Sequence, residues 1–159
     1  MKRKSLKDYK EALLRETALL LATEGPDGIS MRKVAKRVGI SAAGIYKLFR
    51  DKEDLMIEAS RYASLEFKNR VLQMDDIKEI LRATIEHSEK NKWIIRYLAM
   101  KDPSFTKSIF KDIIEHLENL VGNRPKARVM FRLASMQGMI GGKEEEAVIW
   151  DLIDYLLNK

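Results

Sequence analysis

The segment "SMRKVAKRVGISAAGIYKLF", from Ser30 to Phe49, decides the fold because it places two short helices on either side of a tight corner. Apolar residues recur at helical spacing before and after Val38-Gly39-Ile40. Glycine suits the left-handed turn that ends a helix, and Ser30 and Ser41 can each cap the helix that follows. A helix, a glycine-containing corner and a second short helix form the sequence pattern of a helix-turn-helix.

The two faces of this segment differ in a way that points to DNA. The inward positions are apolar and fix the helices against each other: Ile29, Val34, Ala35, Val38, Ile40, Ile45 and Phe49. The second helix turns outward only small residues and one lysine: Ala42, Ala43, Gly44 and Lys47. The major groove of B-form DNA is ~12 Å wide and just admits a helix, so a bare outer face allows close approach to the bases. The preceding helix offers basic residues that could flank the groove near the phosphates: Arg32, Lys33, Lys36 and Arg37.

The distribution of charge supports a polyanionic partner. The chain has 159 residues and a formal net charge of +6. Residues 1–50 hold 12 Lys and Arg against 5 Asp and Glu, and the remaining residues hold 18 against 19. The whole excess therefore lies in the first third, as expected for a basic end that meets a polyanion. Charge alone fits a solubilising tail equally well.

The composition narrows the class of protein. With 45% apolar and 34% charged residues, the chain is predicted to be globular and soluble. No apolar run reaches the ~18–20 residues that a membrane-spanning helix needs, so we expect no membrane partner. The basic start "MKRKSLKDYK" is not followed by a signal core, so we expect a cytoplasmic protein. Without cysteine there is no disulfide framework and no thiolate metal site.

Almost every segment of the chain has helical periodicity, which predicts an all-α fold of about nine helices. The expected helices are 6–24, 31–38, 42–48, 52–72, 75–90, 92–100, 105–121, 125–140 and 144–157. We predict a three-helix, helix-turn-helix DNA-binding domain over residues 1–50. A long fourth helix would join it to a C-terminal helical domain, residues 51–159, for ligand binding and dimerisation.

A longer stretch, "GISMRKVAKRVGISAAGIYKLFRDKEDLM", resembles the N-terminal domain of TetR-type transcriptional regulators. The matching elements are a polar cap before the second helix, Val34-Ala35, Val38-Gly39-Ile40-Ser41, Ile45-Tyr46…Phe49 and Lys52-Glu53-Asp54-Leu55. The resemblance is strong over residues 12–56. Beyond them only the number and placement of the helices match.

The resemblance implies specific DNA contacts. Tyr46 matches a position whose hydroxyl usually contacts a phosphate, and Lys52 matches a lysine that commonly does the same. Arg32 falls where some members place an arginine that reads a base or a phosphate. Each residue also has a plainer interpretation. Tyr46 could be a core aromatic with its hydroxyl at the surface, Lys52 a solvated lysine, and Arg32 the partner of a nearby carboxylate.

The remaining predicted DNA contacts come from the caps and the short helix. Ser30 and Ser41 are expected to touch phosphate besides capping. Gly44 departs from the family, which often has Thr or Ser there, and this loses a hydroxyl contact and weakens the helix by ~1 kcal/mol relative to Ala. Ala42 and Ala43 can touch a thymine methyl group but cannot hydrogen-bond a base. Direct readout would then fall to Arg32, Lys47 and DNA shape.

The last two predicted helices are apolar over so much of their circumference that each must be covered from more than one side. One cover is the protomer itself, and the other is predicted to be the same surface of a second chain, which would give an isologous four-helix interface. The alternative is that both helices lie at the centre of a monomer, but the resemblance favours the dimer. The predicted interface residues are Val129, Leu133, Met136, Gln137, Ile140, Ile149, Leu152, Ile153 and Leu156.

A second apolar group, rich in aromatic residues and methionine, is a candidate lining for a small-molecule pocket. Its members are Trp93, Tyr97, Met100, Phe105, Ile109, Phe110, Ile113 and Phe131. Plain core is the alternative interpretation for each of them. His87 and His116 have no second ligand at helical spacing, so we expect neither a metal nor another cofactor.

These observations favour a homodimeric DNA-binding transcriptional regulator, a repressor that a small apolar ligand releases from a palindromic operator. The alternative is a constitutive or protein-regulated DNA-binding protein without an inducer. We do not expect an enzyme, because the sequence shows no nucleophile–base pair, phosphate loop or metal motif.

Overall fold

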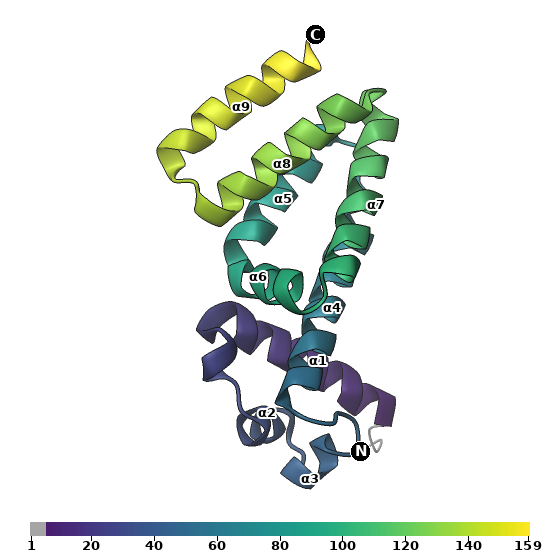
Figure 1. Cartoon of the computed structure of the whole chain (residues 1–159), viewed down its shortest axis with the longest axis vertical. Helices are drawn as coiled ribbons and strands as arrows, with labels where there is room; N and C mark the ends of the chain where they lie inside the picture. Colours follow the sequence, from purple (N-terminus) through teal and green to yellow (C-terminus); the bar gives the residue numbers. More distant parts are fainter. Residues whose placement is uncertain (1–5) are drawn as a thin grey trace. The chain divides into compact units, whose positions relative to one another are not determined.

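The structure, a computed structural model, describes residues 6–159, and within them it is entirely helical (Figure 1). The all-α prediction is therefore confirmed. The elements, in chain order, are α1 (Leu6–Glu24), the short 3-10 helix η1 (Pro26–Gly28), α2 (Met31–Val38), α3 (Ala42–Ile45), α4 (Lys52–Val71), α5 (Ile77–Lys90), α6 (Lys92–Lys101), α7 (Pro103–Val121), α8 (Arg124–Ile140) and α9 (Lys143–Leu157). None of the described helices is long and apolar enough to cross a membrane.

Side-chain caps set the helix starts in the N-terminal part of the chain. The Ser30 hydroxyl oxygen accepts a hydrogen bond from the Lys33 amide at 3.2 Å, and the Ser41 hydroxyl oxygen accepts one from the Gly44 amide at 3.1 Å. Between them Gly39 adopts the left-handed conformation, with φ of 77°, which ends α2. The corner and both caps lie where the sequence pattern placed them.

The described chain divides into two compact units. The first contains α1 to α3 and most of α4, through Leu65, together with Trp93–Phe105. The second contains Glu66–Lys92 and Thr106–Lys159. The first unit thus includes α6, which is distant in sequence from the helix-turn-helix. That residues 1–50 form a domain of their own remains a prediction.

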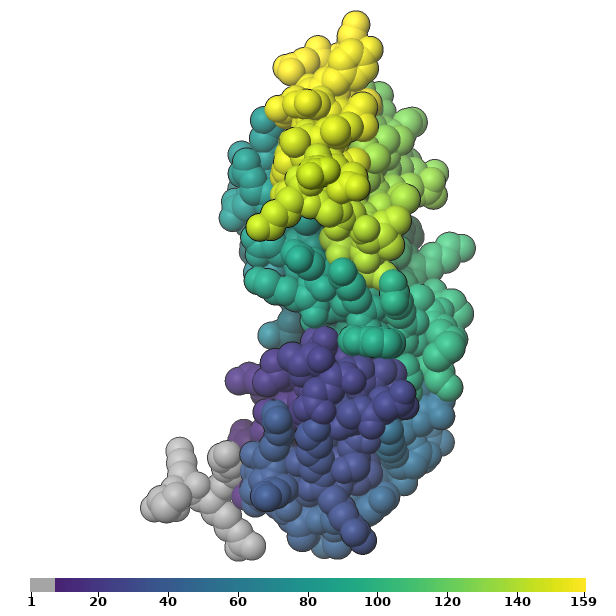
Figure 2. All heavy atoms as spheres, turned by 90° about the vertical axis from the view of Figure 1, so that its left-hand side faces the viewer, coloured from purple at the N-terminus to yellow at the C-terminus, as the bar shows by residue number. Residues whose placement is uncertain are grey.

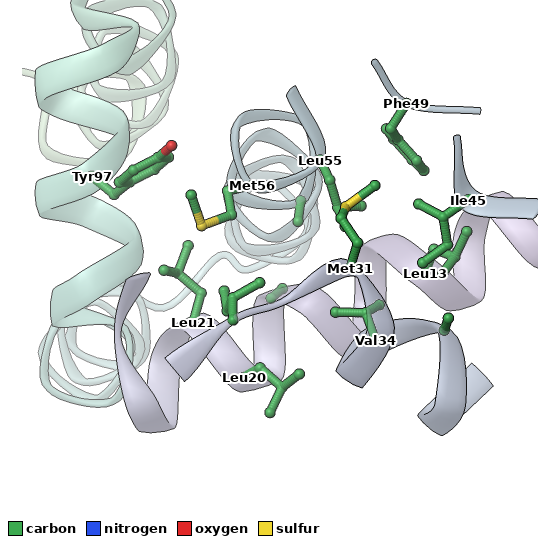
Figure 3. Packing of buried hydrophobic residues seen from close by; sticks show 14 of the residues in the cluster. Leu13, Leu20, Leu21, Met31, Val34, Ile45, Phe49, Leu55, Met56 and Tyr97 are labelled. Carbon is green, nitrogen blue, oxygen red and sulfur yellow. The ribbon is translucent and has the colours of Figure 1, made fainter. Parts of the chain in front are cut away.

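The core of the first unit fixes the position of α3 (Figure 3). Large apolar side chains of α1, α2, α3, α4 and α6 and of the segment after α3 are buried, among them Leu13, Leu21, Val34, Ile45, Phe49, Leu55 and Tyr97. Burying one such aliphatic side chain contributes roughly 1.5–3 kcal/mol, far more than a one-turn helix can gain from its own hydrogen bonds. The orientation of α3 is therefore imposed by the core beneath it.

The second unit is organised by the packing of α5 against α8. Ile80 and Leu81 on α5 and Met130 and Ala134 on α8 are all fully buried. At Gly138 the two helices approach so closely that an added Cβ atom would lie 2.2 Å from the Ile85 carbonyl oxygen. This packing holds the inner side of α8 against its own protomer.

Candidate nucleic-acid interface

The short helix α3 separates an anchored inner side from an open outer side within a single turn. Ile45 is fully buried, yet the next residue, Tyr46, is 57% exposed. Lys47 and Ala43 are also exposed, and Phe49 returns to the core. The helix ends at Ile45 rather than at Leu48 as expected, because the chain tightens there: the Leu48 amide donates to the Ile45 carbonyl, three residues back, at 2.8 Å.

The predicted contact residues of α3 lie together around this open side. Ala42 and Gly44 are half-buried, and Ala43 and Lys47 face solvent. An added Cβ atom at Gly44 would have as its nearest neighbour the Ser41 hydroxyl oxygen, at 3.4 Å, which is ordinary contact. Packing therefore does not require glycine at this position, and the absent side chain leaves the outer face low.

The two capping serines keep their ability to contact a phosphate. A hydroxyl group has one donor and two acceptor positions, and each cap uses an acceptor position. Ser30 and Ser41 are both exposed, so the O–H of each is free to donate to an anion outside the protein. Capping and phosphate binding are thus compatible at both residues.

The four basic residues of α2 fall into two groups. The Lys33 ammonium contacts the Glu24 carboxylate and donates to the Gly28 carbonyl at 3.0 Å, and Arg37 pairs with Glu16 at 2.6 Å. Arg32 and Lys36 are exposed and form no ion pair among the described residues. The positive charge on α2 that is available to a polyanion is therefore that of Arg32 and Lys36. Local charge pairing, which the sequence pattern does not reveal, separates the two groups.

Lys52 opens α4 beside two carboxylates that already have partners. Glu53 pairs with Lys101 at 2.8 Å and raises the pKa of that lysine through their hydrogen bond. Asp54 accepts a hydrogen bond from the Arg50 amide at 3.0 Å. Lys52 itself forms no ion pair in the described chain, and the positive end of the helix dipole lies at its position. Its charge is left for an external anion.

The predicted pocket residues are divided between the two units. Trp93, Tyr97, Met100 and Phe105 belong to the first unit, where Tyr97 is core and Met100 is 68% exposed. Ile109, Phe110, Ile113 and Phe131 belong to the second unit, where Phe110 meets Phe131 edge to face, with ring centroids 5.4 Å apart. The sequence shows which residues are apolar but not how the chain divides between units.

The predicted interface residues range from exposed to buried. Val129, Met136, Ile140 and Leu152 are all exposed, and Leu133, Ile149 and Leu156 are half-buried. Gln137 and Ile153 are instead buried in their own protomer. The Gln137 amide donates to the Gly142 carbonyl at 2.7 Å and so closes the turn between α8 and α9, and Ile153 faces inward on α9.

Two exposed residues of α9 were absent from the predicted interface. Val148 is 59% exposed and Tyr155 is 60% exposed, and both share a helix face with Leu152. Helical spacing alone carries this signal, because positions three, four and seven apart lie on one side. The open apolar surface of the second unit thus runs along both α8 and α9, which lie side by side in Figure 2.

Residues 10–59, which contain α2, α3 and the start of α4, match the family model described as bacterial regulatory proteins, tetR family. The nucleoid occlusion factor SlmA of Vibrio atlanticus (strain LGP32) is 30% identical over 117 residues, which are 68% of this chain and 60% of that protein. The chain therefore spans about 60% of the length of this relative.

Two solved structures share the fold over nearly all of the chain. A candidate transcriptional regulator from Streptomyces coelicolor A3(2) has a TM-score of 0.66 at 19% identity, and the match covers 95% of this chain and 99% of that one. AibR, solved in complex with isovaleryl coenzyme A and operator DNA, has a TM-score of 0.59 at 17% identity, with 94% and 98% covered. The helix-turn-helix geometry and the match over residues 10–59 identify this part of the chain with the tetR family of bacterial regulatory proteins, and the two solved structures share the fold of the chain as a whole.

Proposed function

We propose that this protein is a homodimeric, DNA-binding transcriptional repressor that a small apolar ligand releases from a palindromic operator. The observation that carries the proposal is the open outer side of α3, where exposed Tyr46 follows fully buried Ile45. A core that holds a short helix rigidly while leaving its outer side bare is what insertion into a major groove requires. The family is one of regulatory proteins rather than of enzymes.

In this proposal α3 enters the major groove and its neighbours hold the backbone. Tyr46, Lys52 and the two capping serines contact phosphates, while Arg32 and Lys47 reach base edges or the adjacent phosphates. Lys33 is the weakest of the predicted contacts, because Glu24 already neutralises its charge. Ala42, Ala43 and Gly44 let the helix backbone approach the bases.

A second copy of the chain is the proposed cover for the apolar surface of α8 and α9. Met136 is 57% exposed, Ile140 72% and Leu152 45%. Scattered single apolar residues need no explanation, but several exposed apolar residues on one face of each of two adjacent helices are typical of an interface. A two-fold dimer would present two α3 helices to the two halves of a palindrome.

The ligand part of the proposal rests on composition and on one structural relative. AibR was solved with isovaleryl coenzyme A and operator DNA together. In the present chain the candidates to contact an apolar ligand lie in the second unit, where Phe110 of α7 meets Phe131 of α8. We place the protein in the cytoplasm, where a DNA-binding regulator acts.

DNA binding is tested by titrating a fluorescent palindromic fragment from the promoter region of the protein's own gene. Affinity should fall steeply as salt rises, because lysine and arginine contacts release counterions. Tyr46→Phe and Lys52→Ala should each weaken binding, and Lys52→Ala should also reduce the salt slope by about one. Lys111→Ala, at an exposed lysine on α7, is the matched control and should change nothing. Binding that ignores salt and both substitutions would refute the proposed interface.

The inducer is tested by thermal unfolding of the full chain against a panel of apolar acids, acyl thioesters and planar aromatic compounds. A ligand present at 100 times its dissociation constant stabilises the folded protein by about 2.7 kcal/mol. The same ligand should lower affinity for the DNA fragment. Stabilisation without any loss of DNA affinity would favour a regulator that needs no inducer.

A further inference from the structure

The two helices of the proposed interface carry opposite charge. Between Arg124 and Ile140, α8 contains four basic residues and no acidic one. Between Lys143 and Leu157, α9 contains five acidic residues, and its one basic residue is Lys143 at its start. Such separation of charge between neighbouring helices is not needed for solubility, because a mixed surface serves that purpose as well.

Part of this charge is used inside the protomer. Arg124 pairs with Glu118 at 3.4 Å, and Asp154 pairs with Lys78 at 2.7 Å. The Glu145 carboxylate accepts a hydrogen bond from the Gly142 amide at 2.9 Å. These contacts bind the ends of the two helices to their own protomer.

A second group has no ion pair among the described residues. It comprises Arg128 and Arg132 on α8 and Glu144 and Asp151 on α9, and all four are exposed. Helical spacing places the arginines beside Val129 and Met136, and it places the two acids beside Val148 and Tyr155. Each helix therefore presents an apolar stripe with a charged margin, basic on α8 and acidic on α9.

The sign of the charges distinguishes two ways of building a two-fold dimer on this surface. If the two-fold axis is perpendicular to the helices, within the interface, α8 faces α8 of the second copy. Basic margins then meet basic margins, and acidic margins meet acidic ones. If the axis runs along the helices, between α8 and α9, then α8 of each copy faces α9 of the other. Only the second arrangement places basic margins against acidic ones.

The sequence also fixes a register for the second arrangement. Arg132 precedes Gly141 by nine residues, and Asp151 follows Gly142 by nine. At 1.5 Å per residue, each lies about 13 Å from the turn. A two-fold rotation leaves the position along its own axis unchanged. With the axis parallel to the helices, Arg132 of one copy therefore lies opposite Asp151 of the other. Arg128, one turn away, can reach the same carboxylate.

Resting on the proposed homodimer, we propose that α8 of each copy packs on α9 of the other, with Arg132 of each paired to Asp151 of the opposite copy. The apolar stripes supply the affinity. The charged margins select the arrangement and exclude the alternative in which like charges meet. Because the pairs lie at the margin, their effect weakens as salt screens them.

The test reverses the charges separately and together in the full-length protein. Sedimentation of Arg132→Asp and of Asp151→Arg at low salt should each show a dimer dissociation constant raised about tenfold, because attraction becomes repulsion at two symmetric sites. The combined variant restores opposite charges across the interface and should return to within about threefold of the wild type. Lys107→Asp, at an exposed lysine on α7, controls for a change of net charge. Circular dichroism checks that each variant keeps its helix content.

The outcomes separate this pairing from the dimer itself. A dimer that is unaffected by either single reversal, or a combined variant no tighter than the single ones, overturns the pairing and leaves the proposed homodimer intact. A wild-type chain that stays monomeric at every concentration overturns the homodimer and the pairing with it. Rescue that disappears at 0.5 M salt, where the screening length is about 4 Å, would match the marginal position of the charges.

Discussion

Replacing Gly138 by alanine should destabilise the protein although alanine is the better helix former. Gly138 lies within α8 at its closest approach to α5. The added Cβ atom would lie 2.2 Å from the Ile85 carbonyl oxygen, 2.6 Å from the Ser88 Cβ and 3.0 Å from the Glu89 amide nitrogen. Two of these neighbours are backbone atoms of a helix, so no side chain can rotate away to make room. The two helices must move apart.

Two opposing effects set the size of the change. Glycine to alanine in a helix interior gains about 1 kcal/mol in propensity. Overpacking of a well-filled interface costs 1–3 kcal/mol, and a clash with backbone lies at the upper end or above it. The net loss is therefore about 2 kcal/mol, which lowers the melting temperature by roughly 4–8 °C for a chain of this size.

The measurement is urea unfolding and thermal unfolding of Gly138→Ala beside Gly44→Ala. At Gly44 the nearest neighbour of an added Cβ atom is at 3.4 Å, so only the propensity gain applies and stability should rise by about 0.5–1 kcal/mol. The two variants carry the same chemical change with opposite predicted signs. Equal or greater stability in Gly138→Ala would show that the described α5–α8 approach is wrong.

Two further predictions concern polar groups that are half-buried or buried. His87 stacks on Phe67 with ring centroids 3.8 Å apart, and its burial, with a smaller contribution from Arg70, lowers its pKa to about 4 from an ordinary value of 6.5. As the pH is lowered, His87 therefore binds a proton in the unfolded chain before it does so in the folded one. The free energy of unfolding is unaffected above pH 6.5 and falls as the pH drops toward 4, by about 2 kcal/mol at pH 5. Urea titrations at pH 7.5 and 5.0 should show this loss in the wild type, and most of it should vanish in His87→Phe; an equal loss in both would contradict the assignment. Tyr97 is 6% exposed and its hydroxyl has no hydrogen-bond partner among the described residues, so Tyr97→Phe should raise the free energy of unfolding by about 1 kcal/mol. A loss of stability in Tyr97→Phe would instead indicate a bonded hydroxyl.

The fold was largely predictable because its signals are local. Helical periodicity, the capping serines and the left-handed Gly39 each depend on a few neighbouring residues, and each lies where it was expected. The length of α3 was not predictable from periodicity, because Leu48 continues the apolar spacing although the chain already turns at Ile45. A tight turn and one more turn of helix bury the same residues.

The candidate site was predictable in its residue types and less so in its pairings. Lys47 is exposed, as its place on the outer side of a short helix predicts, whereas Tyr46 was not among the residues expected to face outward and is 57% exposed. The pairing of Lys33 with Glu24 was not predictable, because it joins the helix-turn-helix to the end of α1 across a loop. Likewise, the spacing of Gln137 predicts an interface residue, because the sequence does not show that its side chain bonds the Gly142 carbonyl in the turn after α8.

The brevity of α3 has a consequence for how such a protein fails. A single helical turn is not rigid by itself, so its orientation depends on the two buried apolar side chains beneath it, those of Ile45 and Phe49. Truncating either side chain would make the turn conformationally mobile while the remaining helices stay folded. The protein would then lose specificity for its operator sequence under conditions in which it is still folded. The substitutions responsible would lie at buried residues that do not contact the DNA.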